Sequence, residues 1–133
     1  MPDYLILLRA DPNTFDALSP AAFAELAGRF EAWATPLLAQ GRFLAGQKLT
    51  TDSGRTVRHA SDGVRVKDGP FGETKEMIGG YHLLRADDLD HVTSLCREHP
   101  NVTLLGGTLE IRELEATLAA DRTAPAPSTP PPG

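Results

Sequence analysis

The side chains best suited to proton chemistry gather in one short stretch of this chain. Asp68, Glu73, Lys75 and Glu76 place three carboxylates and one ammonium group within nine residues. Acid–base chemistry near neutral pH needs a raised carboxylate pKa or a lowered lysine pKa, and partly shielded neighbours of this kind shift one another's pKa values. We therefore expect Asp68 to be a catalytic base and Lys75 an electrostatic stabiliser, with Glu73 and Glu76 contributing to binding.

Three further residues complete the candidate site. Tyr81 and His82 follow the charged cluster on the next expected strand, and His82 is the histidine nearest to it in sequence. We expect His82 to be an alternative catalytic base and Tyr81 to contribute to binding. His59 lies upstream, where a hairpin would bring it diagonally across from Asp68, at a cross-strand spacing of about 7 to 8 Å. His59 is therefore a further binding candidate.

Each of these assignments has a structural alternative. Asp68 begins an Asp-Gly-Pro turn sequence, in which the alternative role of its carboxylate is to bond the local backbone. Lys75 and Glu76 also fit a solvated surface pair, and either candidate histidine fits a hydrogen-bonded interior position. His91 and His99 fall on an expected second helix, where a solvated or capping role is the default.

Composition restricts the classes of partner. The chain has 133 residues, with 13 basic and 18 acidic side chains and a net charge of −5, so it offers no positive field for a nucleic-acid backbone. No apolar run reaches the length that spans a bilayer, and we expect a cytoplasmic protein. The single cysteine, Cys96, fits a buried helix position. Neither a phosphate-binding loop nor a metal-ligand spacing is present, so no cofactor and no metal are expected.

The pattern of apolar and turn residues predicts an α+β fold. Strands are expected at residues 4–9, 43–49, 56–59, 64–67, 78–85 and 108–114, and helices at residues 20–40 and about 87–99. The order is β-α-β, a hairpin, then β-α-β. That order matches the split βαβ arrangement of ferredoxin-like folds with a β-hairpin inserted in the middle.

The hairpin register and the chain end carry two more expectations. If Asp62 and Gly63 form the turn, Asp68 shares a strand face with His59 and points toward the core. Beyond about residue 115 the sequence becomes proline-rich and loses periodicity. We therefore expect one domain over residues 1–115 and a disordered tail over residues 116–133.

The run DGPF, followed by ETKE and GGY over residues 68–81, resembles the signature of the DGPF branch of the YCII-related proteins. Residues 31–49 are more loosely similar to the family's first helix and following strand. The resemblance implies a homodimer in which two sheets form an α/β barrel, with a cleft near each motif loop. Exposed apolar sheet surface in a single layer would need such a partner.

The resemblance leaves several functions open. A His-Asp pair and dehalogenation of aromatic compounds have been linked to the broader family, but residues 20–40, where that histidine would lie, contain none. The first hypothesis is a small cofactor-independent enzyme, a lyase or isomerase acting by acid–base chemistry on a small polar or aromatic molecule. The alternatives are a non-catalytic ligand-binding or sigma-factor-associated accessory protein and a purely structural dimerisation module.

Overall fold

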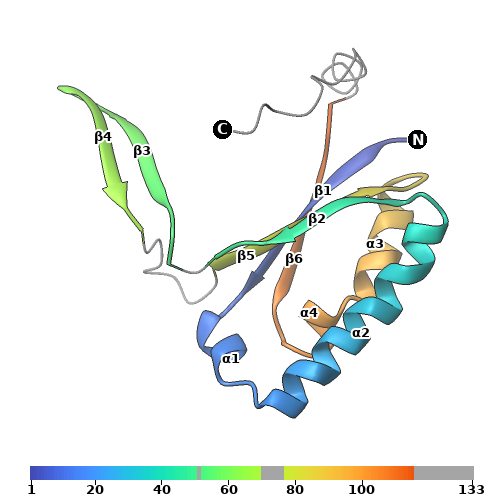
Figure 1. Cartoon of the computed structure of the whole chain (residues 1–133). Helices are drawn as coiled ribbons and strands as arrows, with labels where there is room; N and C mark the ends of the chain where they lie inside the picture. The colour runs from blue at the N-terminus through green and yellow to red at the C-terminus, as the bar shows by residue number, and fades with distance from the viewer. Residues whose placement is uncertain (51, 70–76, 116–133) are drawn as a thin grey trace, which may run out of the picture.

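A four-stranded antiparallel sheet forms the centre of the molecule (Figure 1). The computed structural model describes residues 1–50, 52–69 and 77–115. The strand order across the sheet is β2-β5-β1-β6, and β1 pairs with both β5 and β6. The strands are β1 (Asp3–Ala10), β2 (Phe43–Lys48), β5 (Met77–Arg85) and β6 (Thr108–Glu113).

The helices gather on one side of this sheet (Figure 1). The long helix α2 (Pro20–Ala39) begins where predicted: Ser19 caps it by accepting a hydrogen bond from the Ala22 amide, and proline occupies the first helical position. The second predicted helix is present as α3 (Leu89–Arg97), followed by the short helix α4 (Pro100–Thr103). One more short helix, α1 (Pro12–Asp16), was not predicted.

The hydrophobic core lies between the sheet and these helices. Alternation along β1 directs Tyr4 and Ile6 into it, and Leu84 of β5 joins them; all three are fully buried. Cys96 of α3 lies in the same cluster, where burial raises the pKa of its thiol to about 12. The prediction that this cysteine is a structural residue is therefore confirmed.

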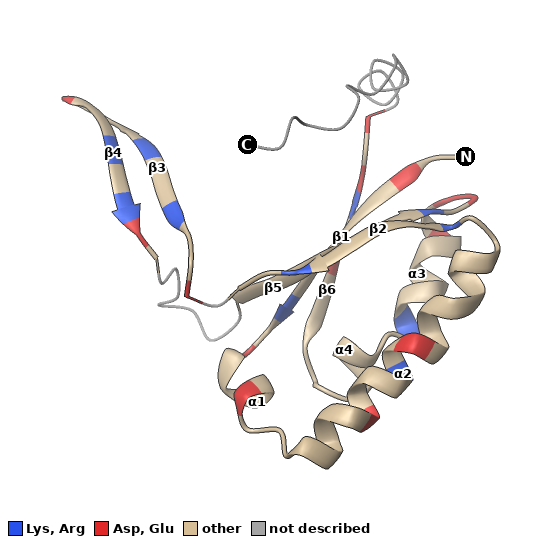
Figure 2. Ribbon diagram, in the orientation of Figure 1, with Lys and Arg blue, Asp and Glu red and all other residues tan. Residues whose placement is uncertain are grey.

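A separate two-stranded sheet, β3 (Arg55–Ala60) and β4 (Gly63–Asp68), forms the predicted hairpin and projects from the main sheet (Figure 1). Both strands carry basic side chains, as Figure 2 shows. Ala60 pairs with Gly63, so the turn residues are Ser61 and Asp62 rather than Asp62 and Gly63. The predicted turn was therefore wrong by one residue, so each residue of one strand has a partner two positions away from the expected one.

This register separates two candidate residues. His59 lies opposite Val64, whereas Asp68 lies opposite Arg55 at the other end of the hairpin. The two still share a face, but they are not diagonal neighbours, so that expectation was wrong. Asp68 also does not point into a core, because it is exposed, as is nearly every other residue of the hairpin.

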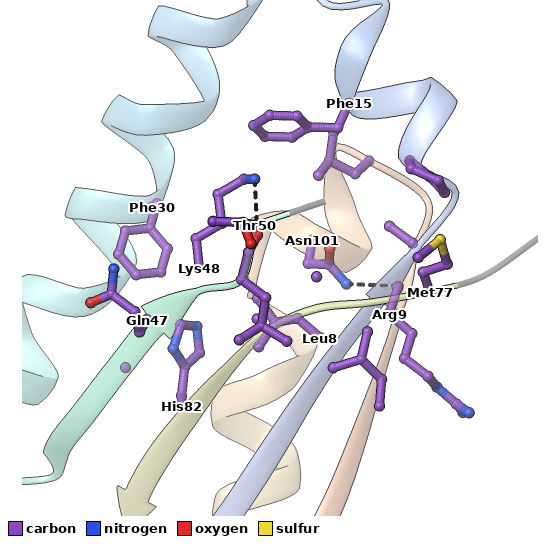
Figure 3. A pocket seen from close by; sticks show the side chains of 18 of the residues that line it. Leu8, Arg9, Phe15, Phe30, Gln47, Lys48, Thr50, Met77, His82 and Asn101 are labelled. Atoms are coloured by element: carbon purple, nitrogen blue, oxygen red, sulfur yellow. Dashed lines mark hydrogen bonds between the residues drawn. The ribbon is translucent and has the colours of Figure 1, made fainter. Parts of the chain in front are cut away.

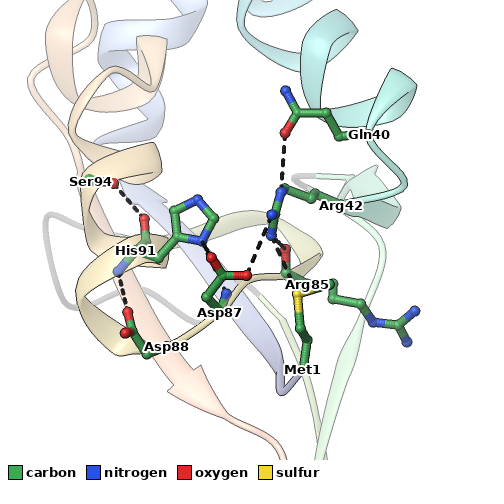
Figure 4. Close-up of polar contacts among 8 residues, drawn as sticks. All are labelled: Met1, Gln40, Arg42, Arg85, Asp87, Asp88, His91 and Ser94. Carbon is green, nitrogen blue, oxygen red and sulfur yellow. Dashed lines mark hydrogen bonds and ion pairs between the residues drawn. The ribbon is translucent and has the colours of Figure 1, made fainter.

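At the end of the sheet where β2 begins and β5 ends, polar contacts tie the elements together (Figure 4). Arg42 Nε donates to Gln40, Nη1 donates to the Arg85 carbonyl at 3.4 Å, and Nη2 lies 3.5 Å from Asp87. Nδ1 of His91 accepts the Asp87 amide at 3.0 Å. The expected role of His91 at the start of the second helix is therefore confirmed.

The element order and the antiparallel pairing are compatible with the predicted α+β ferredoxin-like fold. Residues 116–133, for which a disordered tail was predicted, lie outside the described residues. In the part of the chain that the structure describes, no helix is both long enough and apolar enough to cross a membrane.

Candidate functional site

A cavity of about 1120 Å³ opens at the other end of the sheet, where β2 ends and β5 begins (Figure 3). It lies between α1, the first half of α2 and the ends of β1, β2 and β5. Most of its walls are apolar or aromatic side chains. They include Leu8, Phe15, Phe23, Leu26, Phe30, Phe43, Met77 and Ile78.

Two buried histidines line this cavity. His82 on β5 is 5% exposed and His99, at the start of α4, is 2% exposed. Their Nε2 atoms lie 2.9 Å apart, which is a hydrogen-bond distance. Aromatic rings surround the pair: the Trp33 ring centre lies 4.5 Å from that of His99, and the Phe43 ring centre 5.1 Å from that of His82.

The local structure fixes both rings. His82 and Leu84 are two positions apart on β5, so their side chains lie on the same face of the strand, toward the helices. His99 precedes Pro100 and caps α4, with its Nδ1 accepting the Asn101 amide at 2.9 Å. Trp33, which packs against both histidines, donates its indole N–H to the Leu95 carbonyl at 2.8 Å. The pair is therefore held by strand alternation, a helix cap and an anchored aromatic ring.

Burial keeps both histidines neutral at physiological pH. Burial lowers the pKa of His82 to about 4, and the backbone of Tyr81 offsets part of that change. The pKa of His99 is lowered to about 3, first by burial and then by the proximity of His82. At pH 7 this site therefore contains two uncharged rings that act as hydrogen-bond donors and acceptors.

One nitrogen of the pair has no partner. Nδ1 of His82 is buried and makes no hydrogen bond within the described residues. It faces Gly46 of β2, where a Cβ, had the residue one, would lie 2.6 Å from Nδ1 and 2.8 Å from the Phe43 ring. A side chain at this position would clash with both rings, so the glycine lets β2 pack closely against His82.

Charged side chains stand nearer the mouth. Lys48 Nζ lies 4.6 Å from the centre of the Phe15 ring, and Arg9 forms an ion pair with Glu110 at 3.5 Å (Figure 3 labels Lys48, Phe15 and Arg9). Arg55 also lines the cavity, as do the carboxylate residues Asp11 and Asp16. The site thus combines an apolar interior with a charged rim.

Of the predicted site residues that the structure describes, only His82 lines this cavity. Tyr81 alternates to the other face of β5, opposite Leu7 of β1. Asp68 and His59 lie on the exposed hairpin, where Asp68 forms an ion pair with Arg55 at 2.7 Å. A chemical role for these three residues stays a prediction. Glu73, Lys75 and Glu76 lie outside the described residues.

Sequence reasoning missed His99 as a partner of His82. Two roles were expected for His99, a helix cap or a solvated ring. The capping role is confirmed, whereas the ring is buried rather than solvated. The available signal was the His-Pro-Asn sequence at residues 99–101, since proline is common at the first helical position after a cap. No local pattern connects it to a residue 17 positions earlier.

Within residues 1–50, 52–69 and 77–115, no group of three or more histidine, cysteine, aspartate or glutamate side chains is placed to hold a metal ion. The two rings of the histidine pair contact each other through a hydrogen bond. The chemistry it offers is the donation or acceptance of a hydrogen bond in apolar surroundings.

Comparison with known proteins gives the family. The YCII-related domain matches residues 3–117, so the chain belongs to the YCII-related domain family. It is also similar to an uncharacterized protein of Rhizobium meliloti (strain 1021), with 36% identity over 66 residues that make up 50% of this chain. The chain spans about half the length of that relative, 53% of it. Membership of the DGPF branch stays a prediction.

Proposed function

We propose that the protein binds a small, largely apolar molecule in the cavity above the histidine pair. The observation that carries this proposal is the cavity itself, which is lined mostly by apolar and aromatic side chains together with the buried rings of His82 and His99.

The shape and lining of the cavity support the same proposal. Small-molecule sites are concave, mostly apolar and have a few placed polar groups, with volumes of roughly 300–1,000 Å³. A cavity of about 1120 Å³ with Phe15, Phe30 and Phe43 in its walls suits an aromatic or aliphatic body of that size class. Lys48, whose Nζ lies over the Phe15 ring, favours a polar or negatively charged end.

Acid–base catalysis by a lyase or isomerase is a narrower version of this proposal. A neutral imidazole can polarise a carbonyl by donating a hydrogen bond, as distinct from removing a proton. In this version His82 is the donor rather than the base, and Asp68 is the base with Lys75 as electrostatic stabiliser, the roles that the sequence predicts for these two residues. Binding without turnover, homodimerisation and association with a sigma factor stay predictions beside it.

A binding experiment with small aromatic compounds tests the proposal. Toluene, acetophenone and benzoate are titrated into uniformly ¹⁵N-labelled protein, and the amide shifts of Gly46, Gly80 and Asn101 are followed. At least one compound should shift these amides with a saturable response. If none does so at millimolar concentration, the proposal is wrong.

Two matched variants on α2 locate the binding. Ala27 lines the cavity, whereas Ala24 is exposed on the same helix and does not line it. Ala27→Trp should weaken binding of the compound severalfold by filling the mouth, and Ala24→Trp should leave binding unchanged. Equal effects of the two substitutions would place the binding elsewhere.

A further inference from the structure

Lys48 places an ammonium group in the wall of the cavity. It follows Gly46 by two positions on β2, so both residues belong to the strand face that lines the cavity. Nζ lies 4.6 Å from the centre of the Phe15 ring and donates to the Leu49 carbonyl at 3.4 Å. Figure 3 shows the side chain between Phe15 and Phe30. An ammonium group has three donors, and the described residues use one of them.

The arginines that line the same cavity already have carboxylate partners. Nε of Arg55 donates to Asp68 at 2.7 Å. Nη1 of Arg9 lies 3.5 Å from Glu110. Lys48, by contrast, has no carboxylate at ion-pair distance within the described residues. Its positive charge is therefore available to a bound molecule.

The carboxylates of Asp11 and Asp16 also line the cavity, but neither neutralises Lys48. Oδ1 of Asp11 accepts the Asn13 amide at 2.9 Å and caps α1. Asp16 is exposed at the last position of α1, where water solvates its charge. The charge that lies against an aromatic ring of the cavity is thus the cation of Lys48.

The surroundings of Lys48 suit the anionic end of a ligand. The residue is exposed, so an anion bound to its ammonium group keeps part of its own hydration. The Phe15 ring excludes water from one side of the ammonium group, which strengthens the attraction between opposite charges. The rest of the ligand would contact the apolar and aromatic wall.

We propose that Lys48 makes the cavity selective for amphipathic carboxylates, which have an aromatic or aliphatic body and one negatively charged end. The inference rests on the proposed function, because it names the chemical class of ligand for the same cavity. In this arrangement the body of the ligand occupies the apolar part of the cavity and its carboxylate accepts hydrogen bonds from Nζ of Lys48. Lys48 is then the residue that determines specificity.

The first test compares three compounds of nearly the same shape and different charge. They are 4-butylbenzoate, which is an anion at pH 7, the neutral 4-butylbenzamide and the cation 4-butylbenzamidine. We expect the benzoate to bind about fivefold more tightly than the benzamide in a calorimetric titration at low salt, as one partly exposed, charge-assisted contact supplies. The benzamidine should bind most weakly. Equal affinities of benzoate and benzamide, or tightest binding of the benzamidine, would overturn the inference.

Three variants assign the preference to Lys48. Lys48→Met keeps most of the apolar stem and removes the charge, so the ratio of benzoate to benzamide affinity should fall to about one. Lys48→Arg keeps the charge and should keep a preference for the benzoate. Lys67→Met is the matched control, because Lys67 is exposed on β4 and does not line the cavity. It should leave the ratio unchanged.

The affinity for the neutral benzamide shows whether each variant keeps its cavity. If Lys48→Met binds the benzamide as the wild type does but still prefers the benzoate, Lys48 is not the source of the preference and the inference is wrong. An equal loss of preference in Lys67→Met would attribute it to the overall charge of the protein, which also contradicts the inference.

The outcomes distinguish this inference from the proposed function. If none of the three compounds binds, the proposed function fails and the selectivity fails with it. If the benzoate and the benzamide bind equally well in the cavity, the proposed function stands and this inference alone is wrong.

Discussion

The two ends of the central sheet differ in how completely their shielded polar side chains are hydrogen-bonded. At one end, where β2 begins, the guanidinium of Arg42 donates to Gln40 and to the Arg85 carbonyl and lies against Asp87. At the other end, where β2 finishes, His82 has one satisfied nitrogen and one that is unpaired within the described residues.

The two ends therefore have different roles: the Arg42 end holds elements of the fold together, and the His82 end offers a binding site. The Arg42 contacts join the end of α2, β2, β5 and the start of α3, so its donors are used within the fold (Figure 4). His82 is more deeply buried than Arg42, and its residue lines a cavity with apolar walls while its Nδ1 packs against Gly46. The end of the sheet that carries this cavity is the end open to a ligand.

The largest expected effect is on the acid stability of the histidine end. The folded pKa values of His82 and His99, about 4 and about 3, lie below the 6.5 of an unfolded histidine. At a pH between the folded and unfolded pKa values, the unfolded chain binds more protons than the folded protein. The stability that the two neutral histidines contribute is therefore present above pH 6.5 and is lost as the pH falls. We expect a loss of roughly 3 kcal/mol between pH 7 and pH 5, measured by urea unfolding.

The double variant His82→Phe/His99→Asn is the control for this prediction. It removes both titrating rings while keeping an aromatic ring in the cluster and a capping side chain at α4. Its unfolding free energy should change far less between pH 7 and pH 5. A pH dependence equal to that of the wild type would mean that other groups cause it.

The next effect concerns the space beside His82. Gly46→Ala places a Cβ within 2.6 Å of Nδ1 and 2.8 Å of the Phe43 ring, so one of them must move. We expect a loss of about 1–3 kcal/mol in the free energy of unfolding, together with loss of ligand binding. Gly28→Ala is the matched control, since nothing lies within 4 Å of its Cβ and alanine favours the helix, so it should stabilise by about 0.5–1 kcal/mol.

A smaller effect is expected at the satisfied end. Arg42→Met keeps much of the apolar stem but removes the donors, which leaves the Gln40 side chain and the Arg85 carbonyl without that partner. We expect a loss of about 1–2 kcal/mol by chemical denaturation and no change in ligand binding. Weaker acetophenone binding in this variant would show that the two ends are coupled.

The smallest effect is expected on the hairpin. The side chains of Arg55 and Asp68 are 70% and 78% exposed, so water screens their 2.7 Å ion pair. Asp68→Asn should change stability by less than about 1 kcal/mol in a thermal unfolding experiment. A larger loss would indicate that Asp68 is shielded in solution, for example by a second copy of the chain, and would strengthen its predicted role.

Much of the fold could be predicted because its signals are local. Ser19-Pro20 predicted the start of α2, and the acidic residues at 87 and 88 predicted the start of α3. The apolar run of β1 predicted a central strand, and β1 indeed lies between β5 and β6. The hairpin was also predicted, although its turn residues were wrong by one position because both Ser61-Asp62 and Asp62-Gly63 are acceptable turn pairs.

The site was harder to predict because its residues are distant in sequence. Attention fell on the charged cluster from Asp68 to Glu76, where ionisable side chains are dense. His82 was chosen for its nearness to that cluster, whereas its actual partner is His99, and Tyr81 was placed beside it although alternation turns it to the other face. Density of charge along a chain does not predict which groups are desolvated together.

The sequence by itself determined α2, α3, the six strands and the family motif, because these depend on residue type and on periods of two or about 3.6 positions. Tertiary structure alone decided that His82 and His99 meet, that both lose water and become neutral, and that Nδ1 of His82 packs against Gly46. Desolvation and pairing depend on which surfaces pack together, and strand order with helix placement sets that packing.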